Sequence, residues 1–147
     1  MPTYLTKTAE QTEDLGKKLS HLIKGGEVLA LSGDLGSGKT TFVKGLAKGL
    51  GIKHPITSPT FVLMKIYPVT KHQTIKQLVH VDCYRLPAGR HGVPGIELSK
   101  IGLDDYLNKF DSVVVIEWAE KIKKLPLFTK RVNFKHAKNN FQRIIKL

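Results

Sequence analysis

The sequence has a single cysteine, few acidic residues and no long apolar run. One thiol, that of Cys83, excludes an internal disulfide and any zinc site built from cysteines. No stretch of about 18 apolar residues is present, so neither a transmembrane helix nor a membrane partner is expected. The first residues include acids and lack an apolar core, so no secretory signal is expected. These absences predict a soluble, cytoplasmic protein in a reducing compartment.

Acidic residues are half as numerous as basic ones. The 147 residues include 24 Lys and Arg against 12 Asp and Glu, for a net charge of +12. From Lys121 to Leu147 the sequence has nine basic residues and no acid. This surplus favours a polyanionic partner such as RNA, or phosphate ligands. A lysine-rich, solvated surface would give the same composition, and both interpretations stay open because the lysines are not interleaved with aromatic residues.

The hydrophobic pattern changes between helical and strand periodicity along a single domain of 147 residues. Thr8 can cap a first helix, which Gly25 and Gly26 end. A turn-like run at 137–140 between two β-like runs predicts a C-terminal hairpin. Strands that alternate with helices indicate an α/β sandwich. The expected helices are Thr8 to Lys24, Lys39 to Leu50 and Leu98 to Leu107, and the expected strands before the hairpin are Glu27 to Ser32, Thr60 to Tyr67, Leu78 to Tyr84 and Val113 to Trp118.

An eight-residue run that begins at Gly33, GDLGSGKT, fits the P-loop pattern G-x-x-x-x-G-K-[ST] between an apolar strand and a helix. Gly33, Gly36 and Gly38 let the backbone curl so that several N–H groups converge on phosphates, and the helix adds its positive end. Lys39 can reach the terminal phosphates of a nucleoside triphosphate, and the Thr40 hydroxyl can ligate Mg²⁺. The motif predicts a P-loop NTPase fold: a three-layer α/β sandwich with a mostly parallel central sheet and a C-terminal β-hairpin extension.

Hydrolysis also needs a carboxylate near the metal and a group that orients water. Two acids end apolar strands, since Asp82 ends VHVD and Glu117 ends VVVIE. A P-loop fold places such strand ends beside the phosphates, but spacing alone does not say which acid holds Mg²⁺. The hydroxyl-rich loop 57–60, which includes Thr60, follows the P-loop helix where a γ-phosphate sensor would lie. The alternative interpretations are that the two acids are surface or capping residues at the strand ends, and that the loop 57–60 is an ordinary turn.

Four segments, in this order and spacing, resemble the TsaE family (formerly YjeE): GDLGSGKTTF, SPTF, HVDCYRL and IEW. The segment ELSKIGLDDYL at 97–107 fits as well, and the resemblance runs from about Thr8 to Lys121. It implies a small bacterial P-loop ATPase that joins a TsaD–TsaB complex. That complex forms N6-threonylcarbamoyladenosine next to the tRNA anticodon, and ATP hydrolysis supports its turnover rather than the transfer itself. Whether the chain touches the tRNA directly stays open.

The resemblance also implies cofactors, ATP and Mg²⁺, and a set of site residues. Trp118 would lie next to the site, and Tyr84 and Arg85 would be functional in an unassigned way. Slow hydrolysis by the isolated chain, raised by its partners, is expected because no arginine finger is evident near the P-loop. The implied phosphate-binding residues are Gly36, Ser37, Gly38, Lys39, Thr40 and Thr41, and Gly33 opens the motif. The implied metal site consists of Thr40 and Glu117, with Asp82 beside the metal and the γ-phosphate. The implied catalytic residues are Lys39, Asp82, Glu117 and Thr60, of which Thr60 belongs to a switch-like loop.

Three other functions fit parts of the sequence. The run NKFD at 108–111 spells N-K-x-D, the guanine-reading pattern of GTPases, but it follows an expected helix and the chain has no D-x-x-G. A small-molecule kinase would need a lid arginine, for which Arg90 in its glycine-rich segment is the best candidate. A non-catalytic assembly subunit would bind ATP only as a structural ligand. We also expect Cys83 to be a buried apolar group and His80 to be packed or hydrogen-bonded rather than a metal ligand.

Overall fold

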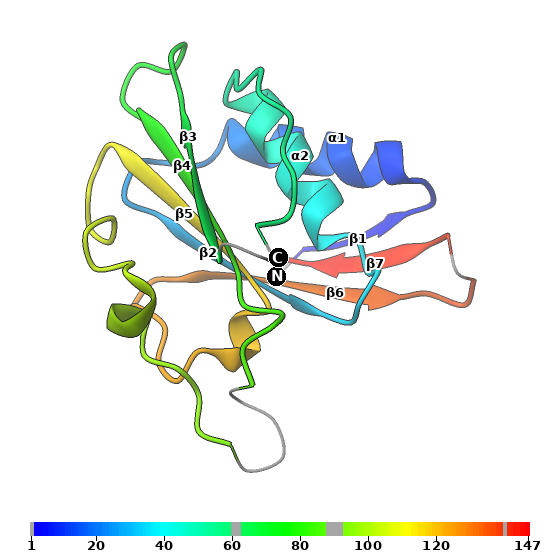
Figure 1. Cartoon of the computed structure of the whole chain (residues 1–147). Coiled ribbons are helices and arrows are strands. Elements are labelled where there is room, and N and C mark those ends of the chain that lie inside the picture. The colour runs from blue at the N-terminus through cyan, green and yellow to red at the C-terminus, as the bar shows by residue number, and fades with distance from the viewer. Residues whose placement is uncertain (1, 60–62, 88–92, 140) are drawn as a thin grey trace.

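A seven-stranded sheet runs through the molecule, with the strand order β1-β7-β6-β2-β5-β4-β3 (Figure 1). The computed structural model describes residues 2–59, 63–87, 93–139 and 141–147, so Thr60 and Arg90 lie outside the described residues. In chain order the strands are β1 (Thr3–Thr6), β2 (Val28–Gly33), β3 (Met64–Pro68), β4 (Gln77–Asp82), β5 (Ser112–Glu117), β6 (Lys130–His136) and β7 (Arg143–Lys146).

The middle of the sheet is parallel and its two edges are antiparallel. Strands β4, β5, β2 and β6 pair in parallel, whereas β3 is antiparallel to β4, and β7 is antiparallel to both β6 and β1. The prediction of a mostly parallel sheet is therefore wrong, because three of the six pairings are antiparallel. The C-terminal hairpin is confirmed as β6 and β7, but it is part of the sheet rather than an extension, since β6 pairs directly with β2.

Both α-helices cover the same side of the sheet (Figure 1). The first, α1 (Ala9–Ser20), is capped as expected by Thr8, whose side chain accepts a hydrogen bond from the Gln11 N–H at 3.2 Å. The second, α2 (Lys39–Gly49), has Leu50 as its C-cap and so ends within one residue of the predicted end. Within the described ranges, no helix is long and apolar enough to cross a membrane.

The opposite side of the sheet carries two 3-10 helices among the described residues, η1 (Leu98–Ile101) and η2 (Ala119–Lys121). The helix predicted from Leu98 to Leu107 is thus wrong beyond its first turn. Gly102 ends η1 in the left-handed conformation, with a φ of 77°, and Leu103 then packs into the core on that side. The three-layer prediction is corrected accordingly: α-helices form one outer layer, whereas short helical turns and loops form the other.

Alternation along the strands divides the core into two clusters. In β2, Leu29 and Leu31 pack on the side of α2, with Phe42 in the same cluster. Val28 and Ala30 pack on the other side, with residues of η1 and η2. Every residue of β5 is buried, as expected of a parallel strand covered on both faces. This burial on both faces fixes the positions of the residues at the ends of the central strands.

Helices α1 and α2 approach each other closely at two glycines. A Cβ atom on Gly16 would lie 2.2 Å from the Phe42 carbonyl oxygen, and one on Gly45 would lie 1.8 Å from the Glu13 carbonyl oxygen. Larger side chains at these positions would push the helices apart. The close contact fixes α2, and with it the loop that precedes α2, against the rest of the chain.

We expect Gly45→Ala to lower the free energy of unfolding by about 1–3 kcal/mol, because the added methyl group separates the helices. This holds although alanine favours a helix by about 1 kcal/mol over glycine. Urea unfolding followed by circular dichroism measures the change. Lys44→Ala, on the exposed side of the same helix, is the control and should shift stability by less than about 0.5 kcal/mol. A Gly45→Ala protein as stable as this control would contradict the close helix packing.

Candidate functional site

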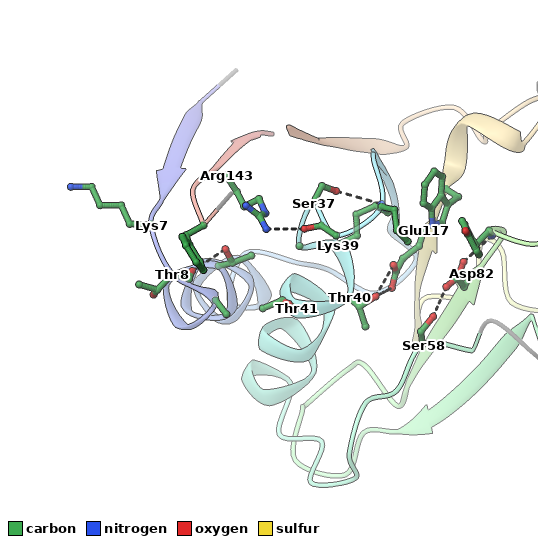
Figure 2. Close-up of a pocket in the computed structure, with 18 residues that line it drawn as sticks. Lys7, Thr8, Ser37, Lys39, Thr40, Thr41, Ser58, Asp82, Glu117 and Arg143 are labelled. Carbon is green, nitrogen blue, oxygen red and sulfur yellow. Dashed lines mark hydrogen bonds between the residues drawn. The ribbon is translucent and has the colours of Figure 1, made fainter. Parts of the chain in front are cut away.

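The carboxyl ends of β2, β5 and β4 meet at one edge of the sheet, beside the amino end of α2. A cleft of about 720 Å³ opens there, and Figure 2 shows the side chains that line it. The residues that the sequence singled out gather in this cleft: its lining includes Gly36, Ser37, Gly38, Lys39, Thr40, Thr41, Ser58, Asp82, Tyr84, Glu117 and Trp118.

The P-loop uses glycine for two different reasons. Gly36 and Gly38 have φ angles of 70° and 98°, in the left-handed region that favours glycine. Gly33 does not line the cleft but lies against β6, where a Cβ atom would come within 2.4 Å of the Phe134 carbonyl oxygen. The loop can therefore curl in front of α2 and still sit close to the sheet, as a phosphate-binding loop requires.

Lys39 is buried beneath its own loop, with 4% of its surface exposed. Its Nζ donates to the carbonyl oxygens of Gly33 and Asp34 at 2.6 and 2.9 Å, and lies 4.0 Å from the centre of the Trp118 ring. Burial lowers the pKa of the ammonium from its usual value, and the Glu117 carboxylate is the first of several that oppose this shift. The Ser37 hydroxyl oxygen accepts a third hydrogen bond from Nζ at 3.4 Å, and a cation held by neutral oxygens beside the cleft is well placed to turn toward a polyphosphate.

Thr40 and Glu117 meet where α2 begins and β5 ends. The Thr40 hydroxyl lies 3.0 and 2.9 Å from the two carboxylate oxygens of Glu117 and donates to them (Figure 2). On β4, the fully buried His80 places its Nε2 2.7 Å from Glu117 Oε1, and its Nδ1 has no partner among the described residues. His80 is thus confirmed as a packed, hydrogen-bonded histidine, and it holds the Glu117 carboxylate in place beside Thr40.

The oxygen atoms at this point fit a hard cation that arrives with a nucleotide. Mg²⁺ prefers oxygen ligands and usually keeps several waters and substrate phosphate oxygens. Thr40 and Glu117 supply two such ligands, and Asp82 stands in register with Glu117 on the neighbouring strand. In the described part of the chain, no group of three or more His, Cys, Asp or Glu residues is gathered to hold an ion. The set therefore suits a metal that also binds phosphate, rather than one held by the protein alone.

Asp82 connects the end of β4 to two neighbouring segments. The Ser58 hydroxyl donates to its Oδ2, and the Tyr84 N–H donates to its Oδ1 at 2.8 Å. Ser58 belongs to the hydroxyl-rich loop 57–60, so this loop does reach a strand-end acid (Figure 2). Thr60 lies outside the described residues, and its role in a switch-like loop stays a prediction.

Trp118 follows β5 in the left-handed conformation, with a φ of 58°, and its ring lies 5.1 Å from that of Tyr84. Both rings line the cleft, whereas Arg85 is exposed and is not part of the lining. Sequence reasoning missed Lys121, which is buried and donates to the carbonyl oxygens of Tyr84 and Leu86. This ammonium ties the turn after β4 to η2. A lysine within a basic segment carries no local signal of such burial.

The C-terminal hairpin supports the P-loop and lines the cleft with Phe141 and Arg143. Arg143 Nη2 donates to the Gly36 carbonyl oxygen at 2.9 Å, and His136 Nε2 lies 3.2 Å from the Leu35 carbonyl oxygen. Arg143 and His136 are cross-strand partners in β7 and β6. An arginine therefore lies close to the P-loop, but it donates to the loop backbone, so the expectation that the chain supplies no arginine finger stays a prediction. Arg143 stands 107 positions from Gly36, and no local pattern reveals a pairing over that separation.

The N-K-x-D run lies at the opposite ends of the parallel strands, next to the amino end of β5. It directly precedes β5, and it packs against the start of β2, where a Cβ atom on Gly25 would lie 1.6 Å from the Phe110 carbonyl oxygen. The P-loop follows the carboxyl end of β2, which is parallel to β5. A strand of six residues separates the two sites by about 20 Å. The run is thus too far from the P-loop to read a base bound there.

Comparisons with known proteins agree with this geometry. A family model described as "Threonylcarbamoyl adenosine biosynthesis protein TsaE" matches residues 6–145, a range that includes the P-loop, both strand-end acids and most of the hairpin. The crystal structure of Bacillus subtilis YdiB superposes with a TM-score of 0.75 at 33% sequence identity, covering 98% of this chain and 82% of that one.

Two curated relatives show the extent of the sequence similarity. The tRNA threonylcarbamoyladenosine biosynthesis protein TsaE of Streptomyces coelicolor is 43% identical over 107 residues, which are 73% of this chain and 66% of that protein. The protein of the same name from Treponema pallidum is 36% identical over 132 residues, 89% of both chains. The chain thus spans about two thirds of the Streptomyces protein and most of the Treponema protein.

Cys83 follows Asp82 and is fully buried, which confirms the expectation of a buried apolar group. Burial, and next the negative charge of Asp82, raise the pKa of the Cys83 thiol to about 12. Since the thiolate is the reactive form, we expect the native thiol to react with Ellman's reagent at about pH 8 at least 100-fold more slowly than after unfolding. Release of the coloured product measures both rates. Rapid labelling of the folded protein would contradict this burial.

Proposed function

The chain belongs to the TsaE family of tRNA threonylcarbamoyladenosine biosynthesis proteins, and on that premise we propose that it binds ATP with Mg²⁺ in the cleft and hydrolyses it in the cytoplasm. The observation that carries the proposal is the contact between Thr40 and Glu117. In P-loop NTPases, a hydroxyl at the start of the helix and a carboxylate from a neighbouring strand hold the metal. The two groups meet here at the amino end of the P-loop helix.

Each group at the site has a part in this proposal. The P-loop backbone receives the phosphates at the amino end of α2. Lys39 exchanges the carbonyl oxygens of Gly33 and Asp34 for the terminal phosphates, so that neutral acceptors are replaced by charged ones. Thr40 and Glu117 hold Mg²⁺, which supplies positive charge to the phosphoryl oxygens when bound.

The hydrogen bonds support different tasks for the two strand-end acids. Glu117 accepts from Thr40, which supports its role as the main metal ligand, whereas Asp82 accepts from Ser58 of the loop 57–60. We assign Asp82 to the attacking water on the γ-phosphate side. The water oxygen bonds to the γ-phosphorus, the bond to the β–γ bridging oxygen breaks, and the proton of the water ends on inorganic phosphate as ADP is released.

We also propose that this hydrolysis supports the turnover of a TsaD–TsaB complex. The family name ties the chain to the modification of tRNA, which requires more than a nucleotide-binding domain. In the structure, the Lys39 ammonium is hydrogen-bonded to oxygen atoms of its own loop, an arrangement that a partner could change. The net charge of +12 suits a partner assembly that carries phosphate or acidic groups.

We expect two variants of the isolated chain to separate binding from hydrolysis. Lys39→Ala should weaken ATP binding at least about tenfold, because a charge-assisted contact to the phosphates is lost. Glu117→Gln should bind ATP within about threefold of the wild type but lower kcat by about 100-fold, because metal-assisted stabilisation of the transition state is lost. Trp118, the only tryptophan of the sequence and 4.0 Å from Lys39 Nζ, reports binding by its fluorescence, and phosphate release reports hydrolysis.

The control for both variants is Glu97→Gln, which removes an exposed carboxylate outside the cleft lining. Full hydrolysis by Glu117→Gln and by Asp82→Asn would overturn the assignment of the carboxylates and favour a subunit that binds ATP without cleaving it. Tighter binding of GTP than of ATP would favour a GTPase over an ATPase as the function of this P-loop.

With purified TsaD and TsaB, the wild-type chain is expected to hydrolyse ATP about fivefold faster or more, a factor typical of coupling between sites. Partner contacts can change the contact between Ser58 and Asp82 and free Lys39 for the phosphates. The Lys39→Ala chain with the same partners is the blank. A rate of ATP hydrolysis that stays unchanged over a full titration of the partners would contradict the partnership but not the proposed nucleotide site.

A further inference from the structure

A second cleft lies at the carboxyl end of α2, the end opposite to the P-loop. It has a volume of about 310 Å³, and among the described residues it shares no lining side chain with the first cleft. Its charged lining consists of Glu13 and of three lysines, Lys44, Lys48 and Lys53. We propose that this lysine cleft binds the phosphate backbone of RNA, a task beyond the proposed function and independent of it.

Two of the three lysines are unmatched within the chain. Lys48 is paired with Glu13 of α1. Lys44 and Lys53 are exposed, and in the part of the chain that the structure describes neither has a hydrogen-bond or ion-pair partner. Lys44 and Lys48 also stand one helical turn apart, where like charges repel and destabilise a helix. A bound anion would relieve this repulsion and supply the missing partners.

Positive charge continues beyond the lysine cleft on both sides. The Lys17 carbonyl oxygen of α1 lies 2.9 Å from where a Gly49 Cβ atom would be, so Lys17 borders the same end of α2. The stem of Lys71 lies 3.4 Å from the position of a Gly51 Cβ atom, which places the β3–β4 turn beside the loop after α2 (Figure 1). Both lysines are exposed. A band of cations from several segments suits a chain of phosphates better than a single anion.

The basic C-terminal segment is less suited to this task, because several of its cations are already matched. Lys123 is paired with Glu97 at 3.3 Å. Lys130 is paired with Glu27 at 2.8 Å. Lys121 is buried and donates to backbone carbonyl oxygens. The unmatched charge at the lysine cleft is therefore the better candidate for an external polyanion.

The lining also indicates which part of a nucleic acid this cleft takes. Lysine is a compact point charge that binds phosphate without a fixed geometry. His54 is a ring in the described lining, which has no Phe, Tyr or Trp, so stacking of successive bases is not expected. Binding should then depend strongly on salt and little on base sequence. RNA is the polyanion at hand, because the chain belongs to a family of tRNA threonylcarbamoyladenosine biosynthesis proteins.

The test follows the binding of a fluorescein-labelled RNA stem-loop by anisotropy at several salt concentrations. The double variant Lys44→Gln/Lys53→Gln is expected to raise the Kd about tenfold. It should also make the slope of log K against log salt shallower by about 1.5, since two phosphate contacts are lost. Lys44→Arg/Lys53→Arg keeps both charges and should bind RNA as the wild type does.

The matched control is Lys100→Gln/Lys124→Gln. It removes the same net charge from two exposed lysines on the opposite side of the sheet, one in η1 and one after η2. Its Kd for RNA should stay within about threefold of the wild type. Binding of ATP with Mg²⁺, measured by Trp118 fluorescence, should be unchanged in both double variants, because none of these lysines lines the first cleft.

Four results would overturn the inference. The first is a wild-type chain that does not bind the RNA at about 50 mM salt. Equal losses in the two double variants would show that net charge, and not the lysine cleft, holds the RNA. A loss that disappears with a second stem-loop of different sequence would show that bases are read. Binding to vesicles of anionic lipid, with none to RNA, would assign the lysine cleft to a membrane surface. Loss of ATP binding in the wild type would remove only the proposed function.

Discussion

Parallel pairing of β4, β5 and β2 is the constraint on which the site depends. It brings the carboxyl ends of three strands to one edge of the sheet, so that Asp82 and Glu117 stand in register and the P-loop opens beside them. Alternation along β4 and β5 places these acids and His80 on one face, while Val81 and its neighbours fill the core on the other. The same pairing sends the N-K-x-D run to the far edge, away from any bound nucleotide.

The basic C-terminal segment, in which no motif is evident, builds one wall of the site. Because β6 pairs with β2, Phe134 lies against Gly33, and the next turn of the hairpin returns Arg143 to the outer side of the P-loop. Part of the positive charge therefore binds the carbonyl oxygens of the loop, next to the place where we locate the nucleotide. Composition alone left RNA, phosphate ligands and solvent open as partners of that charge, and the structure adds a structural role for Arg143.

Local patterns account for what could be predicted from the sequence. The P-loop, the strand ahead of it and the two acids that end apolar strands are all visible within short windows, and the structure gathers them in one cleft. The sequence does not predict β1, because only Thr6 of its four residues is buried and no apolar alternation marks the strand. The helix predicted from Leu98 is too long, because the left-handed Gly102 ends η1. Contacts such as Arg143 with Gly36 depend on strand order, which a single sequence does not reveal.

The central claim is that a metal enters this cleft only with a nucleotide and is then held by Thr40 and Glu117. Electron paramagnetic resonance of Mn²⁺, used in place of Mg²⁺, tests it directly in the wild type and in Glu117→Gln, with and without ATP. The protein-bound Mn²⁺ signal should appear in the wild type only when ATP is present, and metal affinity should fall at least about tenfold in Glu117→Gln while ATP still binds. Metal uptake by the wild type without ATP, or equal uptake by both proteins with ATP, would contradict this claim.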